Sequence, residues 1–227
     1  MSGQGATQDT ARRLSIIIPT LNEQHYLAAT LERLDETRDE IIVVDGGSAD
    51  RTRDVARAAG ARVITAPRGR ARQMNAGAAA ASGEILLFLH ADTHPPTNYA
   101  ACICDAIDGG AVGGAFTLAI DAPNPLYRSI ETAVRIRSRY LGLPYGDQAL
   151  FVSRSAFAKM RGFREIEIME DFDFVRRIRR HGKFSLLDAR VTTSARRWQR
   201  VGPIRVTIQN QVTVLGYLLG IRMRLSK

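Results

Sequence analysis

The stretch Glu84-Ile-Leu-Leu-Phe-Leu-His90-Ala91-Asp92 is an apolar run that ends at a histidine and a carboxylate. Glu40-Ile-Ile-Val-Val-Asp45 has the same form and is followed by Gly46-Gly47-Ser48. Apolar runs without alternation are typical of strands that helices cover on both faces of a parallel sheet. Ligands of open α/β sheets bind beyond the carboxyl ends of the strands. We therefore expect Asp45 and Asp92 at the mouth of a crevice that binds a phosphate-bearing ligand.

The rest of the chain up to about Pro96 alternates between short apolar runs typical of strands and segments with apolar residues at helical spacing. Further expected strands cover 14–19 and 61–65, and expected helices follow Asn22, follow Asp50 and cover 69–81. This alternation predicts βαβ units in an α/β fold. Beyond Thr97 we expect helices at 99–108, 126–141, 154–160, 170–181 and 203–225, and strands at 113–120, 149–153 and 184–187.

Length and composition indicate one globular domain. The chain has 227 residues, of which 45% are hydrophobic and 24% are charged, values that are ordinary for a well-packed domain. Cys102 and Cys104 are too close in sequence for a disulfide between them to constrain much of the chain, and no zinc-ligand pattern accompanies them. The absence of a disulfide framework favours a reducing compartment. Residues 1–13 are expected to be a flexible tail, and no apolar run reaches the roughly 18 residues of a membrane span. We expect a cytoplasmic protein, with attachment to the inner face of the membrane as the alternative.

The net charge of +9 is unevenly distributed. The segment from Arg176 to Lys227 has 13 Lys and Arg against one acid, so it carries +12 and the rest of the chain −3. This asymmetry favours an anionic partner such as a diphosphate, nucleic acid or acidic lipid, with a solvated helix face as the alternative. Residues 201–227 are expected to form a basic amphipathic helix, covered by the core, by another subunit or by lipid.

Four motifs in order carry a family resemblance: Ser15-Ile-Ile-Ile-Pro-Thr-Leu-Asn-Glu23, the segment 42–52, Arg70-Ala-Arg-Gln-Met-Asn-Ala-Gly77, and the run that ends at Asp92. With them the chain resembles the family 2 glycosyltransferases, inverting enzymes of the GT-A fold, over 14–198. With its short length, and with the segments 70–77 and 146–148, the chain resembles a compact bacterial subgroup of stand-alone enzymes in this family. The resemblance implies a mixed, mostly parallel sheet flanked by helices, with a helical C-terminal extension. It divides the chain into a catalytic domain, 14–200, with a nucleotide-sugar-binding half at 14–96 and an acceptor half at 97–200, and the helix 201–227.

The resemblance implies a nucleotide-diphosphate sugar donor, expected to be UDP-linked, across the strand ends. Asp45 can accept hydrogen bonds from a base or ribose, or it is only a turn-forming residue, and Gly46 allows close backbone approach. Asn22 and Glu23 lie where a helix N-terminus supplies free N–H groups. The expected donor site comprises Pro19, Thr20, Asn22, Glu23, Asp45, Gly46, Ser48, Arg72, Asn75, His90, Ala91 and Asp92.

Asp92 is the expected ligand of a divalent cation, Mg²⁺ or Mn²⁺. The family usually shows Asp-x-Asp, whereas this chain has His90-Ala91-Asp92. One carboxylate together with substrate phosphates suffices for Mg²⁺. If His90 binds the metal directly, Mn²⁺ is favoured; otherwise His90 faces the nucleotide or fills space.

Glu170-Asp171 resembles the pair in which the family places its catalytic base. We expect Asp171 to take the proton of the acceptor hydroxyl and Glu170 to orient it, because inverting transfer needs a base and no protein nucleophile. The alternative is that both are first-turn acids that complement the helix dipole.

Two segments resemble acceptor-side and diphosphate-side elements. Asp147 and Gln148 are expected near the acceptor. Arg197 and Trp198 resemble the end of a Gln-x-x-Arg-Trp motif, with Arg197 expected on the diphosphate and Trp198 either in the core or stacked on a sugar. Ser194 replaces the motif's glutamine, which argues against a processive enzyme.

The sequence thus predicts a metal-dependent, non-processive inverting glycosyltransferase with an unidentified hydroxyl acceptor. A lipid-linked acceptor, a homodimer and a peripheral membrane contact are candidate interactions, and nucleic acid is not an expected partner. One alternative is a sugar-phosphate nucleotidyltransferase, although the turn 19–23 lacks the Gly-rich basic loop of such enzymes. A non-catalytic basic module that binds membrane or nucleic acid is the other alternative, and it leaves the strand-end carboxylates unexplained.

Overall fold

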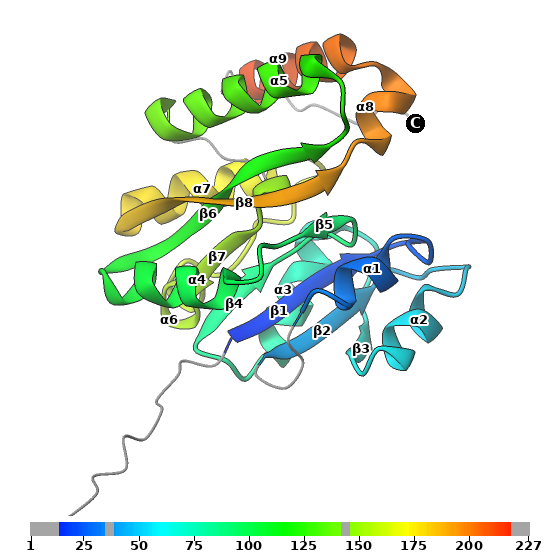
Figure 1. Ribbon diagram of the computed structural model, residues 1–227. Coiled ribbons are helices and arrows are strands. Elements are labelled where there is room, and N and C mark those ends of the chain that lie inside the picture. Colours follow the sequence, from blue (N-terminus) through cyan, green and yellow to red (C-terminus); the bar gives the residue numbers. More distant parts are fainter. Residues whose placement is uncertain (1–13, 35–38, 142–145, 219–227) are drawn as a thin grey trace, which may run out of the picture.

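The computed structural model describes residues 14–34, 39–141 and 146–218, and it is built around one mixed sheet (Figure 1). The described strands form the order β3-β2-β1-β4-β7-β6-β8-β5. Their bounds are β1 Leu14–Thr20, β2 Glu40–Asp45, β3 Arg62–Thr65, β4 Ile85–Phe88, β5 Thr93–His94, β6 Ala111–Asp121, β7 Leu150–Ser153 and β8 Lys183–Ser194.

Helices lie on both faces and at one end of this sheet. They are α1 Leu27–Leu31, α2 Thr52–Ala58, α3 Arg70–Ala80, α4 Tyr99–Asp108, α5 Pro125–Ile136, α6 Arg154–Lys159, α7 Glu170–His181, α8 Arg196–Val201 and α9 Pro203–Leu218, with a π-helical turn η1 Arg137–Leu141 and a 3₁₀ turn η2 Gly146–Gln148. Residues 1–13 and 219–227, on which the expected tail and the end of the expected C-terminal helix fall, lie outside the described residues.

The first half of the sheet is parallel, as the alternating pattern predicted. β1 pairs in parallel with β2 and β4, and β2 pairs in parallel with β3. The register sets Thr20 beside Asp45, and Ile17 beside Phe88. The residues that follow these strands therefore meet at one edge of the sheet, where the crevice was expected.

In the second half of the described sheet, two strands run against the others. β7 is antiparallel to both β4 and β6, β6 and β8 are parallel, and β5 is antiparallel to β8. β8 was expected to end at Leu187 and instead continues to Ser194. Its second part alternates exposed side chains such as Asp188 and Arg190 with buried Val191, a half-exposed pattern that is less conspicuous than an apolar run. This extension returns the chain to the crevice, where Ser194 N donates to Asp92 O at 3.1 Å.

Two apolar cores, one on each face, explain why the first strands lack alternation. Ile16 and Ile18 belong to the core under α1, α2 and α4, whereas Ile17 belongs to the core under α3, α6 and α7. Gly77 of α3 allows the helix to approach β1, because a Cβ there would lie 2.4 Å from the Ile17 side chain.

Helices α5, α8 and α9 lie together beside the ends of β6 and β8, away from β1 to β3 (Figure 1). A small core that includes Tyr127 of α5, Trp198 of α8 and Val206 of α9 joins them to Leu118 and Ile120 of β6. The helix expected over 126–141 is present: α5 covers Pro125–Ile136 and continues directly into the π-helical turn Arg137–Leu141. Among the described residues, no helix has the length and apolarity needed to cross a membrane.

Candidate active site

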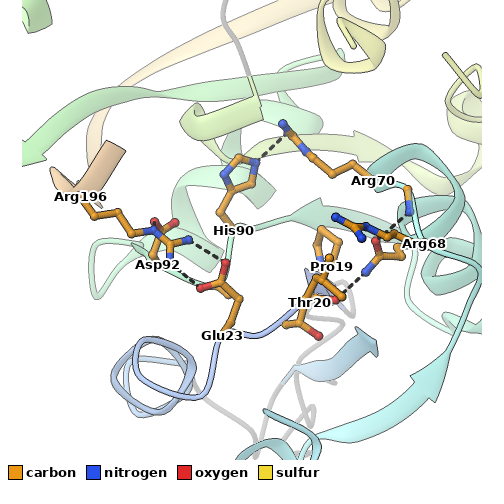
Figure 2. Close-up of a pocket in the computed structure, with 12 residues that line it drawn as sticks. Pro19, Thr20, Glu23, Arg68, Arg70, His90, Asp92 and Arg196 are labelled. Atoms are coloured by element: carbon orange, nitrogen blue, oxygen red, sulfur yellow. Dashed lines mark hydrogen bonds and ion pairs between the residues drawn. The ribbon is translucent and has the colours of Figure 1, made fainter. Parts of the chain in front are cut away.

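A pocket of about 320 Å³ opens at the carboxyl ends of β1 and β4 (Figure 2). Six expected donor-site residues line it, and four arginine or polar side chains that the sequence analysis did not select lie among the others. The lining comprises Pro19, Thr20, Leu21, Glu23, Arg68, Gly69, Arg70, Gln73, His90, Ala91, Asp92 and Arg196. The crevice is therefore at the predicted edge of the sheet.

The turns that follow β1 and β2 are tied to each other. Asn22 N donates to Ser48 Oγ at 2.9 Å, Glu23 N donates to Thr52 Oγ1 at 2.8 Å, and Ala49 N donates to Asn22 Oδ1 at 2.9 Å. The N–H groups expected to be free at this turn are thus already bonded. Asn22 has a φ of 57° and does not cap α1; it and Ser48 brace the pocket wall without lining it.

Asp45 ends β2 as predicted, but its side chain is fully buried and does not line the pocket. Its Oδ2 accepts hydrogen bonds from Gly47 N at 3.0 Å and Ser48 N at 2.9 Å, which is the turn-forming role given as the alternative. Its Oδ1 is buried and has no hydrogen-bond partner among the described residues. A buried unsatisfied oxygen costs free energy, so Asp45 keeps one acceptor available for a donor group.

Gln73 is a pocket residue that the sequence analysis missed. Its Nε2 donates to both Thr20 O and Val44 O at 2.8 Å, which joins the ends of β1 and β2 to α3. Gly46 accommodates this side chain, because a Cβ at Gly46 would lie 3.0 Å from it. The only available signal was its place inside the motif 70–77.

One side of the pocket holds Asp92, Glu23 and Arg196 (Figure 2). Arg196 Nε lies 2.9 Å from Asp92 Oδ2, and the two other guanidinium nitrogens donate to the Glu23 carboxylate at 2.7 Å each. The Arg196 guanidinium also lies 4.4 Å from the centre of the Tyr26 ring. Burial raises the pKa of Asp92 and Arg196 opposes that rise. Arg197, expected on the diphosphate, does not line the pocket; its side chain is exposed and donates to Asn210 Oδ1 at 3.4 Å.

The other side of the pocket holds Arg70 and His90. Arg70 Nη2 lies 2.9 Å from His90 Nε2, and because a guanidinium only donates, Nε2 accepts and the imidazole proton is on Nδ1. Burial, followed by the charge of Arg70, lowers the pKa of His90 well below its usual value. His90 is therefore neutral and its Nε2 is engaged by Arg70. Of the two interpretations given above, the observed contact favours a side chain that faces the pocket over a direct metal ligand.

Arg70 also reaches the expected catalytic pair at the start of α7. Its Nε lies 3.1 Å from Glu170 Oε1, and its Nη2 lies 3.8 Å from Asp171 Oδ2. Asp171 Oδ2 accepts from Gly146 N at 2.6 Å and Oδ1 accepts from Phe172 N at 2.7 Å. Burial raises the pKa of Glu170 and Arg70 opposes that rise. Asp171 is thus held by two backbone N–H groups beside a cation.

A small second void places Asp171 next to the main pocket. Asp171 and Gly146 line this void, and Pro19, Arg70 and His90 line both. The structure therefore brings the expected base and the expected metal ligand to the two sides of one site, separated by Arg70 and His90.

Other expected site residues have structural partners. Arg72 forms an ion pair with Glu165 at 2.8 Å, and Asn75 exchanges two hydrogen bonds of 2.9 Å with the backbone of Phe163. Gln148 Nε2 donates to Phe116 O at 2.9 Å. Trp198 is buried in the core that α8 shares with α5 and α9, which is the first of its two interpretations.

Asp147 of η2 lies beside the expected catalytic pair. Burial raises the pKa of its carboxyl group, and its Oδ1 has no hydrogen-bond partner among the described residues. The charges of Arg137 and Asp171 both act on it. Asp147 therefore resembles Asp45 in keeping one buried acceptor atom without a protein donor.

The donor set of the pocket fits a divalent cation that a ligand helps to bind. Within the described ranges, no three His, Cys, Asp or Glu side chains are grouped as a metal site. Asp92 nevertheless supplies a carboxylate oxygen at the pocket wall, and it already attracts the cationic Arg196. One carboxylate completed by phosphate oxygens is a common way to bind Mg²⁺. Asp92 therefore fits as a metal ligand once a diphosphate is present.

Comparison with known proteins decides the family. The model of glycosyl transferase family 2 matches residues 15–166, more than half of the chain, and so includes both turns, the motif 70–77 and Asp92. The chain belongs to glycosyl transferase family 2. This match confirms the resemblance drawn from the four motifs.

The curated relatives of this family 2 chain are similar over part of their length. Glucosyl-3-phosphoglycerate synthase of Mycobacterium tuberculosis is 30% identical over 107 residues, which are 41% of this chain and 33% of that protein. Dolichol-phosphate mannosyltransferase of Pyrococcus furiosus is 30% identical over 146 residues, 58% of this chain and 42% of that protein. The chain spans less than half the length of these relatives.

Solved structures of glycosyltransferases share the fold. S. aureus TarS in complex with UDP-GlcNAc has a TM-score of 0.66 at 18% identity, over 80% of this chain and 58% of that one. A mannosyltransferase from Pyrobaculum calidifontis in complex with GDP-Man and Mn²⁺ has a TM-score of 0.64 at 18% identity, over 81% and 57%. The family 2 chain therefore has the GT-A fold, as the sequence predicted.

Proposed function

We propose that the protein is a metal-dependent inverting glycosyltransferase, which moves a sugar from a nucleotide-diphosphate donor to an acceptor hydroxyl without processive polymerisation. The observation that carries this proposal is the arrangement of two carboxylate groups around one pocket. Asp92 lies on one side with Arg196, and Asp171 lies on the other behind Arg70 and His90. Family 2 membership and the GT-A fold support the reaction class.

In this proposal the donor diphosphate binds among the pocket arginines. Arg68, Arg70 and Arg196 line the same cavity, and a guanidinium binds phosphate oxygens with charge-assisted hydrogen bonds. Asp92 and the diphosphate would together hold the divalent cation, which would neutralise negative charge on the leaving diphosphate. The three arginines and the cation would thus act on the same leaving group.

Asp171 supplies the base for the displacement. Its carboxylate takes the proton of the acceptor hydroxyl while that oxygen bonds to the anomeric carbon and the bond from this carbon to the diphosphate oxygen breaks. A single displacement of this kind inverts the configuration at the anomeric carbon. Gly146 N–H and Phe172 N–H fix the carboxylate, and Arg70 stabilises its negative charge.

We propose UDP as the nucleotide of the donor. The Oδ1 of Asp45 is an acceptor that lacks a donor among the described residues, and the N3–H of uracil is a donor. Because this side chain is fully buried and does not line the pocket, the turn 45–48 would have to open for the two groups to meet. The relatives do not decide between nucleotides, because TarS was solved with UDP-GlcNAc and the Pyrobaculum calidifontis enzyme with GDP-Man. UDP follows from the resemblance of the segment 42–52, to which Asp45 belongs.

Calorimetric titration with UDP and with GDP, each with and without Mn²⁺, tests the donor site. We expect UDP to bind in the presence of Mn²⁺ and to bind weakly in its absence, with GDP weaker than UDP. Binding of GDP in preference to UDP would overturn the nucleotide assignment. Failure of both diphosphates to bind would overturn the proposed function.

Gly146→Ala is expected to lower turnover about 100-fold, because a displacement of about 1 Å at a catalytic group has an effect of that size. A Cβ at Gly146 would lie 2.5 Å from Arg70 Nη2 and 2.9 Å from Asp171 Oδ2, so both side chains must shift. Steady-state kinetics with a UDP-sugar measures the change, and calorimetry should show a smaller loss of UDP affinity than of turnover, because only Arg70 of the three pocket arginines is displaced. Turnover that stays normal would mean that the position of Asp171 does not limit the reaction.

We further propose that α5, η1 and α9 present a surface that docks on an anionic membrane. Of seven large hydrophobic side chains that are exposed in the described part of the chain, six lie on these elements: Leu126, Ile136, Tyr140, Ile208, Val212 and Leu215. The last three share one face of α9 by their spacing. We call these six side chains the apolar surface.

The charge around the apolar surface favours anionic lipid over a second copy of the chain. Residues 122–141 and 195–218 contain seven arginines besides Arg196, which lines the pocket, and one acid, Glu131, which is buried and accepts from Ile120 N. A two-fold dimer would bring this arginine-rich surface against itself, with like charges opposed. Acidic headgroups would neutralise it instead. Because Tyr217 of α9 contacts Phe172, next to Asp171, a membrane-borne acceptor would be close to the base.

Flotation with phosphatidylcholine vesicles, with and without phosphatidylglycerol, tests this surface. We expect binding only to the acidic vesicles at low salt, and loss of that binding in Val212→Glu/Leu215→Glu. Thr207→Glu/Gln209→Glu is the matched control, since it adds the same charge to exposed positions of the same helix that do not share the spacing of the apolar face. Equal loss in both variants, or a dimer by light scattering that the first variant dissolves, would overturn membrane docking.

A further inference from the structure

Arg196 connects the expected metal ligand to the first turn of the chain. It lies at the start of α8, and its guanidinium contacts Asp92 after β4 and Glu23 after β1 (Figure 2). Its Nε is 2.9 Å from Asp92 Oδ2, and its two terminal nitrogens form a bidentate pair with Glu23 at 2.7 Å. The three groups all line the pocket. Arg196 is thus a fixed cation at the carboxylate on which the divalent cation would bind.

The surroundings of Arg196 keep it in this place. The bidentate pair with Glu23 fixes the orientation of the planar guanidinium, and the Tyr26 ring lies 4.4 Å from it on one face. A guanidinium has a rigid fork of donors and loses little freedom in such a pair. Glu23 therefore acts as the anchor, Asp92 lies 2.9 Å from Nε, and each terminal nitrogen keeps a second N–H for another acceptor.

A divalent cation bound to Asp92 would be a close neighbour of the same guanidinium. It would share this carboxylate with Arg196, whose Nε is 2.9 Å from Oδ2. Two cations on one carboxylate repel each other unless further negative charge is added. Glu23 is already used by Arg196, so within the described residues of the pocket wall the added charge has to come from the ligand.

We propose that Arg196 makes metal binding depend on the donor: in the donor-free protein Arg196 occupies Asp92, and the divalent cation binds together with the diphosphate. This inference rests on the proposed function, in which Asp92 is the metal ligand. It makes Arg196 a positioning residue that couples the two ligands, with Glu23 as the residue that holds it. Coupling between two ligands is reciprocal, so the metal must strengthen nucleotide binding by the same factor.

Electron paramagnetic resonance of Mn²⁺ measures the free metal and tests the inference without any turnover. In the unsubstituted protein we expect UDP to tighten Mn²⁺ binding by about 5- to 150-fold, the usual range for coupled sites. In Arg196→Gln we expect Mn²⁺ alone to bind at least about 10-fold more tightly and the effect of UDP to shrink correspondingly. Arg200→Gln, an exposed position of the same helix, removes the same charge and should leave both constants unchanged.

Two further variants separate the possible failures. If Asp92→Asn abolishes Mn²⁺ binding while Arg196→Gln does not tighten it, the coupling by Arg196 is wrong and the metal site stands. If Asp92→Asn leaves Mn²⁺ binding unchanged, the metal assignment in the proposed function is wrong. Arg196→Lys keeps the charge but not the fork, and should give an intermediate Mn²⁺ affinity; an affinity equal to that of the unsubstituted protein would overturn the role of the bidentate anchor.

Discussion

Asp171→Asn is expected to lower turnover by about two to four orders of magnitude, the usual contribution of a general base. The amide cannot take the acceptor proton, although it keeps the size of the carboxylate. UDP binding should change little, because the main pocket does not include Asp171. Single-turnover kinetics with saturating donor measures the chemical step, and calorimetry measures the binding of UDP.

The backbone contacts of Asp171 require a control for this experiment. Both carboxylate oxygens accept an N–H group, from Gly146 and Phe172, and an amide can satisfy only one of them. An unsatisfied buried donor costs about 1–3 kcal/mol of stability. Thermal unfolding should therefore accompany the kinetics, and assays should be done well below the transition of the variant. Near-normal turnover in the folded variant would show that Asp171 is not the base.

Asp92→Ala is expected to abolish the metal dependence of donor binding. With its carboxylate removed, the pocket wall loses the oxygen ligand that fits the cation, and Arg196 and Glu23 remain paired with each other. UDP should then bind with the same weak affinity whether or not Mn²⁺ is present, as measured by calorimetric titration. Turnover that requires the metal should be lost with it.

Asp54→Ala is the matched control for the Asp92 variant, because Asp54 is an exposed carboxylate on α2 that does not line the pocket. It should keep both the Mn²⁺ dependence and the turnover of the unsubstituted protein. A Mn²⁺-dependent affinity for UDP that persists in Asp92→Ala would place the metal elsewhere.

The fold was largely predictable because the buried strands of its first half are continuous apolar runs in the sequence. The runs that end at Asp45 and Asp92 became β2 and β4, parallel partners of β1 with cores on both faces. β8 was only partly predicted, since its second part is polar and half-exposed and is specified by pairing with β6. The change from α-helical to π-helical hydrogen bonding at Arg137 depends on local backbone geometry that side-chain periodicity does not encode.

The sequence predicted where the site residues lie better than it predicted which groups their side chains contact. Asp92 and Asp171 lie where the motifs placed them, whereas the side chains of Asp45 and Asn75 form hydrogen bonds with backbone groups. The arginines were the main omission. Sequence spacing does not show that Arg196, rather than its neighbour Arg197, meets Glu23, because that contact joins residues 173 positions apart.

The contact between Glu23 and Arg196 also has a consequence for the order in which the protein forms. The parallel strands β1, β2 and β4 come from the first 88 residues, so they can pair before the rest of the chain exists. The pocket wall is complete only after β8 has paired with β6 and α8 has followed it. Because a ligand stabilises only the state that binds it, the nucleotide would select fully folded molecules over partly folded ones during biogenesis.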